Sequence, residues 1–155
     1  MDFAYTPEQE ALRREVRQFI KENVTHDIVE EIESQDHPQG GGPRVKELFK
    51  KIHARGWLGI TYPKEYGGQG GDRMTQYIVE EEFVRVGIPV GLGGSGAPAI
   101  MAAGTEEQKR YYIPKLISRE ISFALGFTEP SGGADLASLR CSRHSRIYET
   151  RRRCA

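Results

Sequence analysis

The sequence predicts a mainly α-helical fold that ends in the first strand or strands of an incomplete β domain. Three observations carry this prediction: capping boxes at 6–9 and 105–108 open helices, apolar residues recur at helical spacing, and a β-prone run follows only at 121–127. With 155 residues, 37% of them apolar, the chain is long enough for one ordinary domain with its own core. We therefore expect helices first and a β region after them.

The first helix begins at a strong start signal. Thr6 can cap it, Pro7 suits its first position and Gln9 completes a capping box. An apolar face follows at helical spacing, made of Leu12, Val16, Phe19 and Ile20. Ile28 and Ile32 then indicate a second, short helix.

Residues 37–43 are rich in glycine and proline and predict a loop. The next apolar stripe is Val45, Leu48, Phe49 and Ile52. Gly56 is placed to end this helix in the C′ position, and 57–72 is expected to form turns. Asp72 can cap a further helix that runs to about Val86. Its expected buried side is Ile78, Val79, Phe83 and Val86.

Residues 91–104 are mostly small, which predicts a tightly packed helix or a loop leading into one. Residues 91–96 also match G-x-G-x-x-G, but no strand precedes them to deliver the glycines to a pyrophosphate, so close helix packing is the preferred interpretation. The helix that begins after Thr105 is expected to stop near Pro114 and restart as 115–119.

Composition excludes several classes of protein. The 22 basic and 22 acidic residues balance, so no overall charge favours nucleic acid as a partner. The N-terminus lacks the pattern of a secretory signal, and no stretch has the apolar density of a membrane span. Cys141 and Cys154 have no metal-ligand spacing and are expected to be reduced thiols in a cytoplasmic protein.

Most other polar residues are interpreted as surface residues. The four histidines lie in separate segments and give no paired metal-ligand spacing, so no metal site is assigned. Residues 80–82 are three consecutive glutamates, expected to form a solvated helix face. The pair Tyr111 and Tyr112 is expected to contribute one ring to the core.

Three motifs resemble the acyl-CoA dehydrogenase family and occur in the family's order. Residues 128–136 (TEPSGGADL) resemble its T-E-P-x-[AG]-G-[ST]-D signature. Without the resemblance, this segment favours a plain β-turn over an anion site. Residues 62–70 (YPKEYGGQG) resemble its P-E-x-Y-G-G-x-G loop, and 103–109 (AGTEEQK) its A-G-T-x-E-Q-K helix start. The resemblance extends over residues 1 to about 140.

The resemblance implies an N-terminal helical domain at 1–118 and the start of a flavin-binding β domain at 119–140. It also implies FAD as cofactor. The implied flavin contacts are Leu125, Phe127 and Thr128 near the ring and Gly132, Gly133 and Ala134 at the pyrophosphate. Many relatives have Ser or Thr in place of Ala134, so one hydrogen bond of about 0.5–1.5 kcal/mol is lost and weaker FAD binding is expected.

The implied reaction is α,β-oxidation of an acyl-CoA thioester, with electron-transfer flavoprotein as acceptor. A carboxylate base removes the α-proton while the β-hydride passes to the flavin. In relatives the base belongs to a C-terminal helical bundle, and no residue here matches it; no catalytic residue is assigned and the chain is expected to be inactive alone. The alternative is a non-catalytic helical subunit of a mixed assembly. A homo- or hetero-oligomer is expected either way.

Two further segments carry open alternatives. One segment is rich in small residues: Gly93, Gly94, Ser95, Gly96, Ala97 and Ala99. It resembles the region that lines the acyl tail in relatives, where small side chains would leave room for a long or bulky acyl group. The alternative is that the small residues only allow close contact between helices. The tail at 141–155 accumulates arginine where the resemblance stops. We interpret it as a frameshifted or otherwise aberrant end; the alternative is a basic arm for an anionic partner such as the CoA phosphates or nucleic acid.

Overall fold

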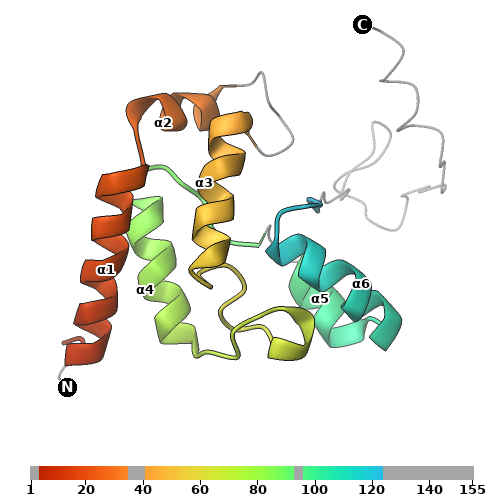
Figure 1. Ribbon diagram of the computed structural model, residues 1–155. Coiled ribbons are helices and arrows are strands. Elements are labelled where there is room, and N and C mark those ends of the chain that lie inside the picture. The colour runs from red at the N-terminus through yellow and green to blue at the C-terminus, as the bar shows by residue number, and fades with distance from the viewer. Residues whose placement is uncertain (1–3, 35–40, 93–95, 124–155) are drawn as a thin grey trace, which may run out of the picture. The chain divides into compact units, whose positions relative to one another are not determined.

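The computed structural model describes residues 4–34, 41–92 and 96–123 (Figure 1). The chain divides into two units after Phe123, and these residues belong to the first. Their helices are α1 (Pro7–Asn23), α2 (His26–Glu33), α3 (Pro43–Ala54), α4 (Arg73–Val84), α5 (Gly96–Ala103) and α6 (Glu106–Ile117), with a 3-10 turn, η1 (Lys64–Tyr66), between α3 and α4. The mainly helical fold is confirmed.

The predicted helix starts are confirmed by their hydrogen bonds. The Thr6 hydroxyl accepts from the backbone N–H of Gln9 at 3.3 Å, and the Gln9 side chain accepts from the N–H of Thr6 at 2.9 Å. Thr105 and Gln108 form the same reciprocal pair at 3.2 and 2.9 Å. Asp72 caps α4 by accepting two N–H groups of the first turn at 2.8 and 2.9 Å. Each cap satisfies donors that have no partner within the helix.

The end of α3 also follows the sequence. Gly56 adopts a positive φ of 71° at the C′ position and donates to the carbonyl of His53 at 2.8 Å. Trp57 donates to the carbonyl of Ile52 at 3.3 Å, which completes a Schellman motif. The loop predicted at 37–43 extends one residue too far at its C-terminal end, because Pro43 belongs to the first turn of α3. At that position the N–H that proline lacks would have no partner within the helix, so its loss costs nothing.

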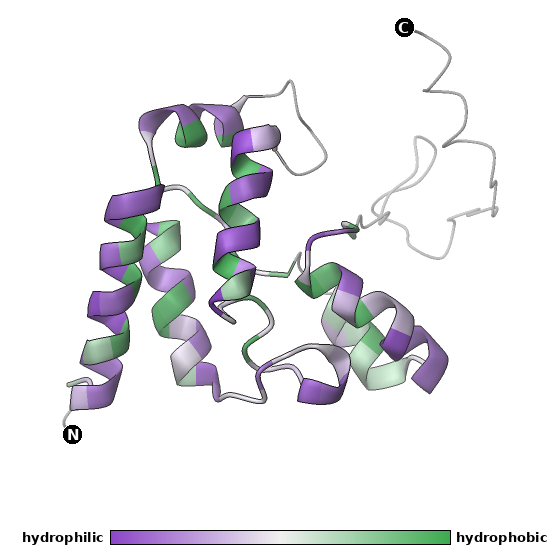
Figure 2. Ribbon diagram, viewed as in Figure 1, coloured by the Kyte–Doolittle hydropathy of each residue, from purple (hydrophilic) through white to green (hydrophobic). Residues whose placement is uncertain are grey.

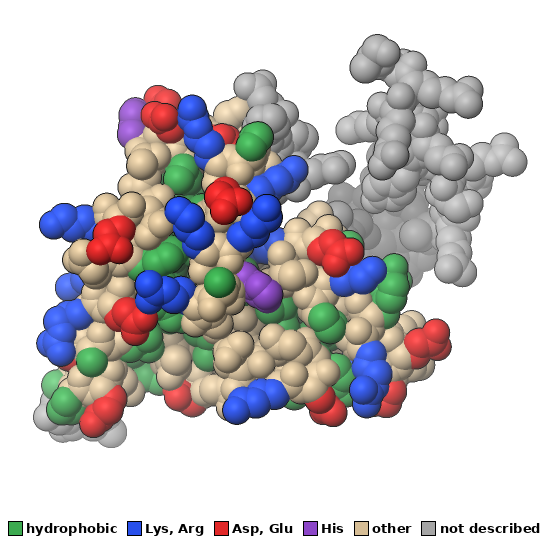
Figure 3. Space-filling model, viewed as in Figure 1, with side chains coloured by type: hydrophobic (Ala, Val, Ile, Leu, Met, Phe, Trp, Pro, Cys, Tyr) green, Lys and Arg blue, Asp and Glu red, His purple; other side chains and the backbone are tan. Residues whose placement is uncertain are grey.

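The core forms where the apolar faces of the helices meet. Helix α1 packs along α4, and Figure 2 shows apolar residues of α1 on the side turned toward α4. The rings of Phe19, Trp57 and Phe83 stack edge to face, with centroids 5.1 to 6.1 Å apart. On the face seen in Figure 3, acidic and basic side chains are interspersed, as expected from their equal numbers.

Two expectations for α6 are wrong. The helix does not restart at Pro114 but continues through it to Ile117. Proline removes one hydrogen bond, and the burial of Ile113, Leu116 and Ile117 on either side of it offsets that loss. Those three residues occupy the inward face. Neither tyrosine therefore reaches the core: Tyr111 is 55% exposed and Tyr112 is 40% exposed.

Several predicted features lie wholly or mainly outside the described residues. Most of the predicted strand 121–127 is among them, as is the greater part of the expected β region at 119–140 and the whole tail at 141–155. None of the helices in the described ranges is long and apolar enough to cross a bilayer.

Candidate functional site

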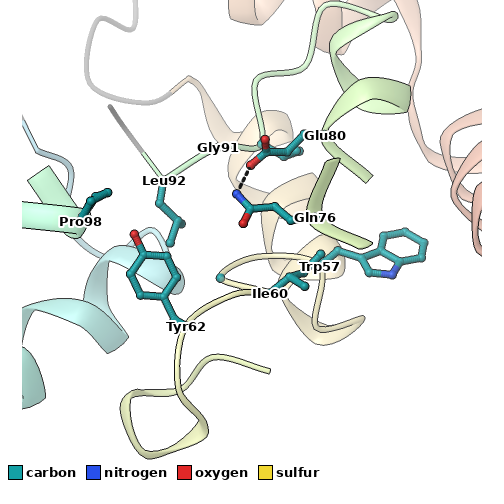
Figure 4. A pocket seen from close by; sticks show the side chains of 10 residues that line it. Trp57, Ile60, Tyr62, Gln76, Glu80, Gly91, Leu92 and Pro98 are labelled. Carbon is teal, nitrogen blue, oxygen red and sulfur yellow. Dashed lines mark hydrogen bonds between the residues drawn. The ribbon is translucent and has the colours of Figure 1, made fainter. Parts of the chain in front are cut away.

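Three segments enclose a pocket of about 200 Å³ (Figure 4). They are the loop 57–62 after α3, one face of α4, and the stretch 90–92 together with the start of α5. The lining is apolar on several sides, with Trp57, Ile60, Val90, Leu92 and Pro98. Tyr62, Gln76 and Glu80 add polar groups. The pocket is therefore lined by a mixture of apolar and polar groups, and convergent polar groups of this kind fix the orientation of a small molecule.

The loop that forms one wall depends on its glycines. The backbone N–H of Gly71 donates to the carbonyl of Ile60, and that of Gly70 donates to the carbonyl of Tyr62, both at 2.8 Å. A Cβ at Gly68 would overlap the carbonyl of Tyr62, so no larger residue fits there. The glycine-rich motif at 62–70 therefore folds the chain back on itself and fixes the pocket wall.

A short chain of hydrogen bonds forms the polar floor of the pocket. The Thr61 hydroxyl donates to Oε1 of Gln76 at 2.7 Å, and Nε2 of Gln76 donates to Oε1 of Glu80 at 2.6 Å. Gln76 and Glu80 are four residues apart on α4 and so lie on one face of that helix. Burial, and secondarily the negative charge of Glu80, raises the pKa of Tyr62, which keeps its hydroxyl protonated.

Arg119, which the sequence did not indicate, supports the part of the pocket wall formed by 90–92. The Arg119 guanidinium donates from Nη2 to the carbonyls of Pro89 and Gly91, both at 2.9 Å, and lies 4.0 Å from the ring centre of Phe49. Burial lowers the pKa of Arg119. Its backbone has a φ of 60°, a strained value for a residue with a side chain. No sequence pattern marks a non-glycine residue for that conformation.

The expectation that residues 80–82 form a solvated face is wrong for Glu82, which is only 5% exposed. Its carboxylate accepts from Nε of Arg13 at 2.7 Å and from Arg17 at 2.8 and 2.9 Å. These contacts join α4 to α1. The hydrogen bonds from Arg17, reinforced by Arg13 and opposed by burial, lower the pKa of Glu82.

The flavin-contacting residues predicted from the resemblance all lie outside the described residues: Leu125, Phe127, Thr128, Gly132, Gly133 and Ala134. Of the small residues, Gly96 and Ala97 are buried, and a Cβ at Gly96 would overlap the ring of Phe123. Close packing therefore accounts for Gly96. Across 4–34, 41–92 and 96–123, no three His, Cys, Asp or Glu side chains gather as metal ligands would.

Comparison with known proteins decides the family. The family model of the acyl-CoA dehydrogenase N-terminal domain matches residues 6–120, which is most of the chain. The chain belongs to the acyl-CoA dehydrogenase family. The pocket lies within the matched residues, so it is a feature of an acyl-CoA dehydrogenase N-terminal domain.

The relatives are similar in both sequence and structure. Acyl-CoA dehydrogenase FadE26 from Mycobacterium tuberculosis is 41% identical over 142 residues, which cover 90% of this chain and 36% of that protein. The ChsE4-ChsE5 complex from the same species contains a chain with a TM-score of 0.71 at 38% identity, over 90% of this chain and 35% of that one. The Tcur3481-Tcur3483 steroid ACAD also gives 0.71 and 38%, over 90% and 36%. This chain thus spans about a third of the length of these acyl-CoA dehydrogenases.

Proposed function

We propose that this chain forms the acyl-binding N-terminal part of an FAD-dependent acyl-CoA dehydrogenase, which introduces a double bond between Cα and Cβ of an acyl thioester. The observation that carries the proposal is the pocket between the 57–62 loop, α4, the stretch 90–92 and Pro98, within the matched family domain. Its apolar side chains suit the hydrocarbon part of an acyl chain, and its polar side chains can bind a polar group on that chain.

In the proposed reaction this chain positions the substrate. Trp57, Ile60 and Leu92 would bury the acyl group and exclude water from it. FAD, when bound, supplies the acceptor for the β-hydride; residues 125–134 are predicted to hold it. No residue of the 155 is assigned as the carboxylate base, and we expect this stretch of chain alone to show no turnover.

We further propose a bulky acyl group as substrate. Gly91 lines the pocket without a side chain, so a ligand can approach its backbone and the neighbouring Glu80, whose Oε1 lies 3.8 Å from the position of a Cβ at Gly91. A relative that is 38% identical is a steroid ACAD, which supports a large, rigid acyl group. The small residues at 93–95, which the sequence suggested for the same role, lie outside the described part of the chain.

A second candidate function is a non-catalytic subunit that completes a partner dehydrogenase. It is favoured by the two-component relatives, the ChsE4-ChsE5 complex and Tcur3481-Tcur3483. Affinity purification of the tagged chain from its own cells distinguishes the two candidates. A stoichiometric partner chain that carries FAD supports the second candidate, and electron-transfer flavoprotein is the acceptor we expect for either.

The main proposal is tested by a domain exchange. Residues 6–120 of this chain would replace the matched part of FadE26, and the chimera would be assayed for FAD content and for reduction of a dye acceptor by acyl-CoA. FadE26 itself, prepared in parallel, is the control. We expect the chimera to retain FAD and to oxidise acyl-CoA. A folded, FAD-bound chimera that oxidises none of the acyl-CoAs accepted by FadE26 would contradict the proposal.

A further inference from the structure

The polar floor of the pocket has a chemical preference of its own. We propose that Glu80 accepts a hydrogen bond from a hydroxyl group on the far part of the acyl chain, so that the substrate is a hydroxylated, bulky acyl-CoA. This inference rests on the proposed function, since it assigns the acyl group to the pocket. It goes further by stating which polar group that acyl chain carries and which residue selects it.

The three consecutive glutamates of α4 differ in their partners. Glu82 is paired with two arginines, and Glu81 forms an ion pair with Arg85 at 2.6 Å. Among the described residues, Glu80 has no such cation: its hydrogen bond comes from the neutral amide of Gln76. A carboxylate offers about four acceptor positions, so Glu80 retains capacity for a further donor.

The hydrogen bonds beneath Glu80 fix the direction of this preference. Because the Thr61 hydroxyl donates to Oε1 of Gln76, the amide turns its NH₂ group toward Glu80. That donor engages Oε1 of Glu80 and leaves the carboxylate with acceptor positions for a further donor. A ligand oxygen that carries a hydrogen would complete the chain, whereas a carbonyl or ether oxygen would present lone pairs to a negative charge.

The surroundings of Glu80 make this contact selective. Figure 4 shows Gln76 and Glu80 together on one side of the pocket, with Tyr62 and Leu92 on another. Gly91 is adjacent to the carboxylate: a carbon at its Cβ position would lie in van der Waals contact with Oε1 of Glu80, at 3.8 Å, so a ligand group beside Gly91 can reach the carboxylate. Glu80 is half-buried, and a ligand that covers it without offering a donor displaces water from the carboxylate and does not replace its hydrogen bond, so ligands that lack the hydroxyl should bind more weakly.

Binding of small probes to the complete 155-residue chain tests the inference without any turnover. Cyclohexanol, cyclohexanone and methylcyclohexane would be titrated into ¹⁵N-labelled protein, and the amide signals of Ile60, Glu80 and Gly91 followed by NMR. We expect saturable shifts with cyclohexanol and an affinity about tenfold lower for the other two probes. Glu80→Gln should lower the cyclohexanol affinity by a similar factor and leave that of methylcyclohexane unchanged.

Two further variants guard against misfolding and general charge effects. Glu33→Gln removes an exposed carboxylate on α2 and should leave all three affinities unchanged. Thr61→Val frees the Gln76 amide to rotate and should weaken cyclohexanol binding by a smaller factor than Glu80→Gln. Equal affinities for cyclohexanol and cyclohexanone, no effect of either pocket variant, or no binding of any probe would overturn the inference. An inactive domain-exchange chimera would instead count against the proposed function.

Discussion

The helix pair α1–α4 and the helix pair α5–α6 differ in the types of residue that they contain. Between α1 and α4 lie a buried carboxylate, two arginines and the rings of Phe19 and Phe83. The pair α5–α6 instead uses small residues for close approach, contains Pro114 inside a helix and leaves two tyrosines exposed. Both pairs contribute apolar residues to the same core.

This difference implies that the α1–α4 pair mainly stabilises the fold, whereas the segment at the start of α5 borders the space for a ligand. The rings and charges between α1 and α4 have one favourable arrangement, because edge-to-face rings and bidentate arginine contacts are directional. Residues of α4 line one side of the pocket, and Gly91, Leu92 and Pro98, which precede or begin α5, line another. We infer that α4 gives the pocket a fixed polar floor, while Gly91, without a side chain, lets a ligand approach that floor.

The largest effect is expected from Phe83→Ala. Phe83 is fully buried between the rings of Phe19 and Trp57, so truncation leaves a cavity and should lower the free energy of unfolding by about 3–5 kcal/mol. Urea denaturation followed by circular dichroism measures the change. The neighbouring Val84 is 62% exposed, and Val84→Ala is the control, expected within about 0.5 kcal/mol of the unaltered chain. Similar losses in both variants would contradict the proposed core.

Glu82→Gln should have the next largest effect. It removes the charge that pairs with Arg13 and Arg17, and we expect a loss of about 2 kcal/mol in the free energy of unfolding. Glu81→Gln breaks a more exposed pair and should cost no more than about 1 kcal/mol. If the order of these two variants were reversed, the ion pairs between α1 and α4 would not be the stabilising feature.

The same carboxylate makes stability depend on pH. Because its folded-state pKa is lowered, Glu82 binds fewer protons in the folded than in the unfolded state. Its contribution is complete above the unfolded pKa of about 4.3 and is lost as the pH falls through the folded pKa. Melting temperatures between pH 3 and pH 6 should therefore fall more steeply for the unaltered chain than for Glu82→Gln; parallel curves would exclude this role.

A smaller effect is expected at Arg119, where side chain and backbone oppose each other. Both Arg119→Ala and Arg119→Gly remove the hydrogen bonds to Pro89 and Gly91, but only glycine relieves the positive φ. Arg119→Gly should therefore be more stable than Arg119→Ala by about 1 kcal/mol. Chemical denaturation of the two variants side by side gives the difference directly. Equal stabilities would mean that the backbone of Arg119 is not strained.

The smallest effect is expected from Tyr112→Ala. Tyr112 is 40% exposed on α6, and its truncation should change the free energy of unfolding by no more than about 0.5 kcal/mol. Thermal unfolding is sufficient to measure it. A loss comparable with that of Phe83→Ala would show that α5–α6 depends on aromatic packing as strongly as α1–α4 does.

The sequence predicted the helices well because their signals are local. The caps at Thr6, Asp72 and Thr105 and the C′ glycine Gly56 act within four residues of chain, and each is confirmed by its own hydrogen bonds. Apolar spacing likewise identified Val16, Phe19, Ile52 and Phe83 as buried residues.

The errors occur where partners are distant in the sequence. Glu82 has the surface pattern of its neighbours and is buried only because Arg13 and Arg17 reach it from α1. Pro114 remains helical because its neighbours are buried by tertiary contacts that no local rule contains. The polar floor of the pocket was missed for the same reason: Thr61 and Gln76 come from separate elements, and no motif joins them.

The most direct test of the acyl-binding role is a substitution at Gly91 in the FadE26 chimera. Gly91→Leu would add a large apolar side chain to the pocket lining beside Glu80, and Ala102→Leu, on an exposed position of α5, is the matched control. The quantity to measure is kcat/KM for a polycyclic acyl-CoA. We predict a loss of about tenfold or more for Gly91→Leu and little change for Ala102→Leu. An unchanged kcat/KM in the Gly91→Leu chimera would show that the acyl group binds elsewhere.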